Sequence, residues 1–211
     1  RPDRLSFQGD SDNPSWSPDG RYVYYNGIRD EESGIFRRAA DFTGVEELVI
    51  SGSLSNPNLS RDGNWLLYQN SGDIEAYSLV DSTVISLVAG EGRQLVPKIS
   101  PDGGFVAYAT NERGGFRIFV KEFAGDAIVE VSEGPGPFRD PVWSPDGRFL
   151  YFIQRTGTIL LRVEVQLSPS FRRLSRPEEV ARLGDSADYS PHPDSERIIV
   201  VSGGLAVTEM D

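Results

Sequence analysis

The 211-residue sequence predicts an all-β protein built from repeated antiparallel sheets, and three observations support this prediction. The first is a near-copied segment that reads NPSWSPDGRYVYY from residue 13, VPKISPDGGFVAY from residue 96 and DPVWSPDGRFLYF from residue 140. The second is its period, because the turn serine recurs at steps of 43, 40, 44 and 48 residues. The third is the spread of 22 Gly and 14 Pro along a chain without long helical patterns. Such a period indicates a repeat architecture. The turn position is held by Ser17, Ser60, Ser100, Ser144 and, in a degraded fifth copy, His192.

Each copy begins with a hairpin. A short strand that starts at a proline, residues 14–17 in the first copy, leads into the turn Asp19-Gly20. Asp-Gly between two apolar runs is a strong hairpin signal, because Gly adopts the required positive φ without steric cost. The strand that follows, residues 21–25, is apolar on both faces, as expected for a strand covered on both sides.

Two more strands are expected in each copy. Third strands are predicted at 34–40, 73–80, 115–123 and 157–165, and fourth strands at 46–50, 83–88 and 127–131. Residues 176–183 are compatible either with a turn or two of helix or with an irregular outer strand. Four antiparallel strands every 40 to 48 residues are typical of the blades of a β-propeller.

We predict a single domain, residues 1–211, with five blades. The fifth copy supplies only three strands, near 188–191, 197–202 and 205–209, and residues 3–9 resemble an outermost strand. Pairing that N-terminal strand with the last three would close the ring and remove exposed strand edges. The alternative is a fragment of a six- or seven-bladed ring. The predicted units are 13–52, 56–90, 96–134, 140–184, and 188–211 together with 3–9.

The repeated turn residues are expected to be structural. Their carboxylates can accept nearby backbone N–H groups, whereas a catalytic residue need not recur in every blade. The two tryptophans that precede the turn, Trp16 and Trp143, are predicted to pack between blades. The turn acids are Asp19, Asp62, Asp102, Asp146 and Asp194.

Composition limits the partners. With 32 acidic and 21 basic side chains the net charge is −11, so the field of the protein repels nucleic acid and anionic lipid. No apolar run is long enough for a transmembrane helix, and the chain has no cysteine for a disulfide or a thiol nucleophile. Because the sequence starts at Arg1 without a signal pattern, we expect a processed protein or a piece of a larger one.

The run Trp-Ser-Pro-Asp-Gly-Arg followed by an apolar strand resembles the TolB-like β-propeller repeat. That family includes the periplasmic TolB translocation protein, propeller domains of prolyl oligopeptidase-type peptidases, and extracytoplasmic sensor domains of bacterial kinases and regulators. Residues 160–180, continuing into 189–201, look most like the last blades of the sensor group. The resemblance implies a propeller that binds, in a periplasmic or other extracytoplasmic location.

Candidate chemistry is sparse. The single histidine, His192, occupies the degraded turn, and residues 184–188 lack the final Gly of a nucleophile elbow. Residues 9–13 offer oxygen ligands suited to Ca²⁺ but lack the pattern of an EF-hand, so a solvated turn explains them better. The basic run is interpreted as a solvated strand edge. Its members are Arg172, Arg173 and Arg176. We therefore expect no enzyme activity, cofactor or metal.

A ligand is expected at the channel mouth, where loops between consecutive blades meet loops that join second and third strands. The loop 27–33 is the longest of these, and 111–114 and 155–156 are the others. Amides, acids and arginines there suit a polar guest. The predicted binding residues are Asn13, Asn56, Gln94, Arg113, Arg139, Asp140 and Asp188.

Three functions follow from these features. The first is a non-enzymatic, monomeric binding or sensory module that holds a protein or peptide segment, or a small polar ligand. The second is a carbohydrate-active enzyme, either a glycoside hydrolase or a lyase, with paired carboxylates drawn from Asp12, Asp140 and Asp188. The third is a structural propeller without a ligand.

Overall fold

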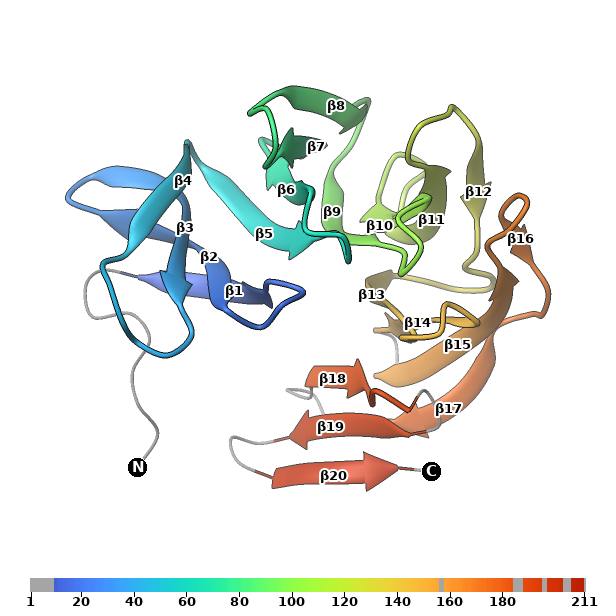
Figure 1. Ribbon diagram of the computed structural model, residues 1–211. Coiled ribbons are helices and arrows are strands. Elements are labelled where there is room, and N and C mark those ends of the chain that lie inside the picture. The colour runs from blue at the N-terminus through green and yellow to red at the C-terminus, as the bar shows by residue number, and fades with distance from the viewer. Residues whose placement is uncertain (1–9, 156–157, 184–187, 195–196, 203–205, 211) are drawn as a thin grey trace. The chain divides into compact units, whose positions relative to one another are not determined.

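The computed structural model describes residues 10–155, 158–183, 188–194, 197–202 and 206–210. These residues form β-strands, turns and loops and contain no helix, which confirms the predicted all-β class. They divide into two compact units, residues 1–97 and 98–211, with the boundary inside one strand. Figure 1 shows the strands of each sheet following one another in chain order.

The first unit holds two four-stranded antiparallel sheets and the start of a third. The second and third strands of each sheet pair through a tight hairpin, for example with Tyr22 opposite Ala39. The first sheet contains β1 (Ser11–Trp16), β2 (Tyr22–Arg29), β3 (Glu32–Ala39) and β4 (Glu47–Ser51), and the second contains β5 (Leu54–Leu59), β6 (Trp65–Asn70), β7 (Asp73–Ser78) and β8 (Val84–Val88).

The second unit continues the same order. The third sheet contains β9 (Gln94–Ile99), β10 (Phe105–Thr110), β11 (Arg117–Glu122) and β12 (Ile128–Glu130). The fourth contains β13 (Phe138–Trp143), β14 (Phe149–Gln154), β15 (Ile159–Gln166), β16 (Arg172–Arg173) and β17 (Glu178–Arg182). The fifth contains β18 (Asp188–Pro191), β19 (Ile198–Ser202) and β20 (Ala206–Met210).

The outer edge of the fourth sheet resolves the ambiguous segment. Residues 176–183 form no helix, because β17 pairs antiparallel with β15, with Arg162 opposite Glu178. The short strand β16 pairs with the far end of β15, so Arg172 and Arg173 lie on a strand edge as predicted. Arg173 also forms an ion pair with Glu133 of the loop after β12.

The predicted closing strand, residues 3–9, lies outside the described residues. So do Thr156 of a predicted mouth loop and residues 184–187 of the rejected nucleophile elbow. The five sheets of the described chain follow the five sequence copies, and the closed five-bladed ring stays a prediction.

The repeated Ser-x-Asp-Gly turn has one geometry in four copies. In the fourth copy the Ser144 hydroxyl donates to Asp146 Oδ1 at 2.6 Å, and Asp146 Oδ1 also accepts the Arg148 N–H at 3.0 Å. The Phe149 N–H donates back to Ser144 Oγ at 2.9 Å, and Gly147 lies at φ 74°. The carboxylate therefore accepts the hydrogen bonds of the polar groups of its own turn, which confirms its structural role. The equivalent serine-to-aspartate bonds are Ser17–Asp19, Ser60–Asp62 and Ser100–Asp102.

The degraded fifth copy keeps the turn with different side chains. The His192 N–H donates to the Arg197 oxygen at 2.8 Å, as the turn serine does elsewhere. Asp194 lies 3.0 Å from His192 Nδ1 and 2.7 Å from Arg197 Nη2. The histidine therefore takes part in a turn network in place of serine.

The core lies between adjacent sheets. Tyr24 and Ile35 of the first sheet pack with Leu66 and Tyr68 of the second in one buried cluster. A second cluster joins Tyr151 of the fourth sheet to residues of the fifth. Sheets that bury both faces against their neighbours explain why the central strands are apolar on both sides.

The two tryptophans differ, although they occupy the same repeat position. Trp143 is 7% exposed, lies edge-on to Phe171, and donates its indole N–H to the Lys98 oxygen at 2.8 Å. This confirms packing between sheets for Trp143. Trp16 is 61% exposed, so the same prediction is wrong for the first copy. Local sequence does not distinguish them, because burial depends on what the neighbouring sheet supplies.

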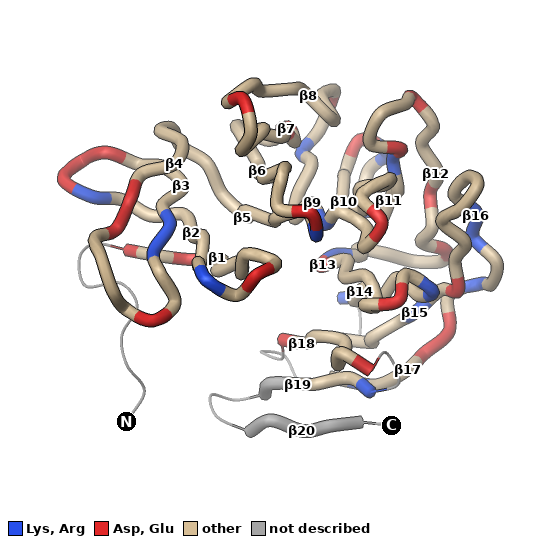
Figure 2. Tube along the Cα trace, in the orientation of Figure 1, with Lys and Arg blue, Asp and Glu red and all other residues tan. Residues whose placement is uncertain are grey.

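The distribution of charged residues and the absence of a long apolar helix among the described residues agree with what the composition predicts. Figure 2 shows basic residues interspersed with acidic ones along both units. Within the described ranges, no helix is long and apolar enough to cross a membrane. The same residues contain no group of three or more His, Asp or Glu side chains arranged to hold a metal ion, and this includes the described part of segment 9–13.

Candidate ligand-binding site

A repeated bulge shapes the first strand of the sheets. In β13 the register shifts between Arg139 and Val142, at Asp140, which lies at φ 55° just before a proline. Proline has no N–H to give to the sheet, so it is tolerated where the hydrogen-bond ladder is interrupted. The bulge re-aims the preceding side chain. The same left-handed residue before proline recurs at Asn13, Asn56 and Val96.

The fifth copy lacks this bulge. Asp188 occupies the repeat position of Asp140, but Tyr189 follows it in place of proline. The β18–β19 pairing is regular from Asp188 to Pro191. A residue with an N–H can join the ladder, so the strand stays in register. Asp140 and Asp188 therefore share a repeat position, but the first lies in a bulge and the second in a regular strand.

Arg139, Asp140 and Asp188 come from consecutive first strands of the second unit. Arg139 Nε lies 3.1 Å from Asp140 Oδ2, and both side chains are 39% exposed. The Tyr189 hydroxyl donates to the Asp140 backbone oxygen, which links β18 to β13. Asp140 and Asp188 interact electrostatically with each other. The structure thus brings together three of the predicted site residues.

Lys98 completes this group. It lies on β9, is partly buried, and interacts electrostatically with both Asp188 and Asp140. Loss of hydration lowers the pKa of Lys98, and the two carboxylates oppose this shift. We call Lys98, Arg139, Asp140 and Asp188 the inner-strand charge cluster.

Burial also shifts the pKa of Asp140 and that of the adjacent Tyr189. It raises the pKa of Asp140 above its ordinary value, whereas the charge of Arg139 lowers it and that of Asp188 raises it further. Burial raises the pKa of Tyr189 well above the ordinary value, and the two carboxylates add to this shift. The phenol therefore stays protonated and acts as a donor. Shifted groups in one place are typical of functional sites.

The cluster can recognise polar guests. Guanidinium and ammonium groups donate several hydrogen bonds, and carboxylates accept them. Two cations beside two anions favour a guest that carries both donors and acceptors, because an anion or a cation alone meets repulsion from half of the site. A peptide segment or a small polar molecule has this character.

The predicted residues of the first unit have separate surroundings. Asn13 Nδ2 donates to Asn26 Oδ1 at 3.0 Å, and Asn56 Nδ2 donates to Gln69 Oε1 at 3.2 Å. Gln94 is 0% exposed, and its amide donates to the Glu91 oxygen at 3.4 Å. Gln94 is therefore a core residue of β9, not an exposed amide.

Arg113 lies away from the inner-strand charge cluster. Its side chain is 71% exposed, its Nη1 is 3.7 Å from Glu130 Oε2, and its guanidinium lies over the Phe119 ring at 5.5 Å. These contacts place Arg113 against the third and fourth strands of its own sheet. The structure does not bring it to Asp140.

Sequence reasoning missed Lys98 and Tyr189. The equivalents of Lys98 are Ser15, Asn58, Val142 and Ser190, so the repeat gives no signal at this position. For Tyr189 a signal existed, because it replaces the proline present in the four other copies. A departure from the repeat can mark a residue with its own contact.

The fold has known relatives. No protein-family model matches the sequence. An uncharacterized protein of Agrobacterium fabrum is 30% identical over 210 positions, which cover 90% of this chain and 64% of that protein. TolB from Acinetobacter baumannii superposes with a TM-score of 0.76 at 17% identity, over 90% of this chain and 48% of its own.

Two further solved structures are similar. A protein assigned as TolB from Agrobacterium tumefaciens gives a TM-score of 0.70 at 18% identity, over 82% of this chain and 66% of its own. An oligogalacturonate lyase in complex with manganese gives a TM-score of 0.66 at 11% identity, and the match covers 88% of this chain and 57% of the lyase chain. At such low sequence identities, the structural similarity shows the fold alone. The chain therefore has the fold of TolB-like β-propeller proteins, and it spans 64% of its curated relative and about half of the first of these TolB structures.

Proposed function

We propose that this chain is a non-enzymatic binding or sensory module that holds a polar peptide segment or a small polar ligand at the inner-strand charge cluster. The observation that supports this most directly is the convergence of Arg139, Asp140, Asp188 and Lys98 from three consecutive first strands. Charged groups that lose hydration without a full set of partners gain energy when a complementary guest supplies the missing hydrogen bonds.

The wider setting belongs to the same proposal. The TolB-like neighbours are consistent with an extracytoplasmic location. We propose in addition that the module works as a monomer and that its partner is a protein segment. The net charge of −11 disfavours nucleic acid, because counterion release on binding needs a basic surface.

A random peptide library displayed on phage tests this function. The purified chain is immobilised, peptides are selected, and the affinity of the best ones is measured by calorimetry against Arg139→Ala/Asp140→Ala. The double variant keeps the net charge and removes one cation and one anion. Affinity should fall at least about tenfold, since each charge-assisted hydrogen bond contributes about 1.5–3 kcal/mol.

A matched control is available in the same unit. Arg182 and Glu179 form an ion pair of 2.8 Å on β17, with side chains 69% and 45% exposed. Arg182→Ala/Glu179→Ala makes the same chemical change away from the cluster and should leave affinity unchanged. Selected peptides that bind both double variants as tightly as the parent would refute the site.

A carbohydrate-active enzyme is the second candidate. Asp140 and Asp188 occupy one repeat position in neighbouring strands, and the raised pKa of Asp140 is a property of a general acid. The neighbour that is an oligogalacturonate lyase has this fold, although at 11% identity. Turnover of polygalacturonate and other polysaccharides, abolished by both Asp140→Asn and Asp188→Asn, would replace the binding proposal with this one.

A further inference from the structure

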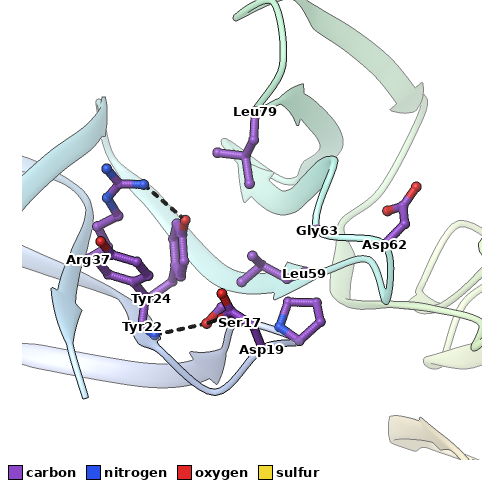
Figure 3. Close-up of a pocket in the computed structure, with 10 residues that line it drawn as sticks. Ser17, Asp19, Tyr22, Tyr24, Arg37, Leu59, Asp62, Gly63 and Leu79 are labelled. Atoms are coloured by element: carbon purple, nitrogen blue, oxygen red, sulfur yellow. Dashed lines mark hydrogen bonds between the residues drawn. The ribbon is translucent and has the colours of Figure 1, made fainter. Parts of the chain in front are cut away.

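A cavity lies between the first two sheets of the first unit, beside their shared core. It has a volume of about 310 Å³ and lies between the Ser-x-Asp-Gly turns and the third strands. Figure 3 shows Arg37 and Tyr24 on one side, Leu79 and Leu59 opposite them, and Asp19 and Asp62 nearer the turns. A volume near 300 Å³ is at the lower end of small-molecule sites. The cavity belongs to a different unit from the inner-strand charge cluster.

One wall is polar and carries unused donors. The Arg37 guanidinium is fixed by Glu47 Oε2, at 2.9 Å from Nε and 2.7 Å from Nη2, and lies over the Tyr22 ring at 4.9 Å. Its Nη1 has two N–H groups and donates one, at a long 3.5 Å, to the Tyr24 hydroxyl. Within the described part of the chain, that hydroxyl donates its own proton to no acceptor. This wall can therefore bind a carboxylate.

The turn side of the cavity is acidic. Asp19 and Asp62 line it, and hydrogen bonds from the turn serines lower the pKa of both carboxyls. Both are therefore ionised at neutral pH. Figure 3 shows the Asp62 carboxylate beyond its turn and away from Arg37, where its oxygens accept hydrogen bonds from Ser60 and Asn64. Since Glu47 already pairs with Arg37, Asp19 adds negative charge beside a cation whose charge is largely balanced. A simple anion is disfavoured here, and a guest needs a positive group as well as a negative one.

The remaining wall is apolar. Leu59 is 9% exposed, and Leu79 is partly buried against the same cluster of core residues. A guest with an aliphatic body removes these side chains from water without leaving a polar group unpaired.

We propose that this cavity binds a small zwitterion of the amino-acid class, with its carboxylate at Arg37 and Tyr24, its ammonium group toward Asp19, and its aliphatic side chain against Leu59 and Leu79. This site is independent of the peptide or ligand site proposed at Asp140. The ligand would contact the polar, the acidic and the apolar wall of one cavity.

Three probes of matched size test the class of ligand. L-leucine carries both charges, 4-methylpentanoic acid lacks the amino group and therefore the cation, and L-leucinamide has lost the anion. Calorimetric titration of the purified chain should detect L-leucine, with each of the other two at least about tenfold weaker, because each loses a charge-assisted contact. Equal binding of all three forms, or no binding of L-leucine, overturns the proposal.

Two variants with matched controls test the place. Tyr24→Phe removes the free hydroxyl, and its control is Tyr151→Phe, because Tyr151 hydrogen bonds Arg162 at the same repeat position in the fourth sheet. Asp19→Asn removes one charge and keeps the turn acceptor, and its control is Asp146→Asn in the equivalent turn.

The variants and their controls should separate binding from folding. Tyr24→Phe and Asp19→Asn are expected to weaken L-leucine binding by roughly fivefold or more, while both controls bind as the parent does. The thermal midpoint of each variant, measured without probe, shows whether it is folded. A folded Tyr24→Phe variant with unchanged affinity rules out this site, and so does equal loss in the controls.

Discussion

The indole N–H of Trp143 donates to the backbone oxygen of Lys98 at 2.8 Å and so joins β13 to β9. Trp143 is 7% exposed, whereas Trp16 at the same repeat position is 61% exposed. Trp143→Phe leaves the Lys98 oxygen without this donor and a small void beside it. We expect a loss of about 2 kcal/mol in the free energy of unfolding, measured in urea.

Trp16→Phe is the control for that measurement. A substitution at an exposed position should change stability by no more than about 0.5 kcal/mol. Similar losses for the two tryptophans would show that the hydrogen bond to Lys98 does not account for the effect.

Two neighbouring glutamates, Glu46 and Glu47, should also differ in how much they stabilise the fold, because their ion pairs are buried to different extents. Arg29 Nε is 2.5 Å from Glu46 Oε1, the side chains are 10% and 20% exposed, and the Tyr25 hydroxyl also donates to Glu46. Glu46→Gln leaves the largely buried Arg29 without a counter-ion and should cost about 2 kcal/mol. Urea unfolding of the purified variant measures this cost.

Glu47→Gln, one residue further along, is the control. Glu47 is 51% exposed and its partner Arg37 is 34% exposed, so this change should cost less than about 1 kcal/mol. A larger cost for Glu47→Gln than for Glu46→Gln would contradict the ranking by burial.

Val96 has a backbone conformation that its side chain disfavours. It lies at φ 52°, where Asn13 and Asn56 stand in the first two copies. A β-branched residue in the left-handed region is strained by roughly 1–2 kcal/mol, and asparagine tolerates that region better. Val96→Asn should therefore raise the urea midpoint, with a gain of about 1 kcal/mol.

The reverse swap checks the cause. Asn13→Val puts the branched side chain at an exposed position of the same conformation, φ 52°, and also removes the hydrogen bond to Asn26, so it should lower stability by at least a similar amount. If both substitutions shift the midpoint in the same direction, strain at this φ is not the explanation.

Asp140 should make stability depend on pH in a particular direction. Burial raises its folded-state pKa above the ordinary value of 3.8, with a further rise from Asp188 and opposing effects of Arg139 and Lys98. A raised pKa favours the protonated, folded form, so its contribution is fully present below about 3.8 and is lost as pH rises through the folded-state value. Asp140→Asn has no carboxylate to desolvate and should be more stable than the parent at neutral pH.

The gain should disappear in acid. Urea midpoints measured from neutral pH down to about pH 3 are expected to converge for Asp140→Asn and the parent. Glu179→Gln, at the exposed Arg182 pair, is the control and should differ little from the parent over this range. A constant difference between Asp140→Asn and the parent would indicate a cause other than this carboxyl.

The hairpins were predictable because their signals are local. Asp-Gly turns fix the start of the second strand within a residue or two, as in β2 from Tyr22 after Asp19-Gly20 and β14 from Phe149 after Asp146-Gly147. The bulges were also predictable from the prolines, since a proline inside a strand requires a break in the hydrogen-bond ladder. The left-handed conformation of the residue before each proline was not predicted. The choice between helix and strand at residues 176–183 was not local, because β17 is formed by pairing with β15.

The candidate site was predictable only in part. Arg139, Asp140 and Asp188 were expected together because they share a repeat position or adjoin it, and the structure places them together. Gln94 was placed with them although the equivalent residue of the third copy is Val96. Counted from the turn serine, Gln94 stands where Leu54 and Phe138 stand in the adjoining copies, and it is buried as they are.

The sequence by itself determined the repeated hairpin, its period and the role of the turn acids, because each rests on contacts within a few residues of the chain. Tertiary structure decided which tryptophan is buried, why Lys98 belongs with Asp140 and Asp188, and where the cavity beside Arg37 lies. Those features arise between strands some forty residues apart, where distance and hydration depend on how sheets pack, and no local pattern of side chains records that packing.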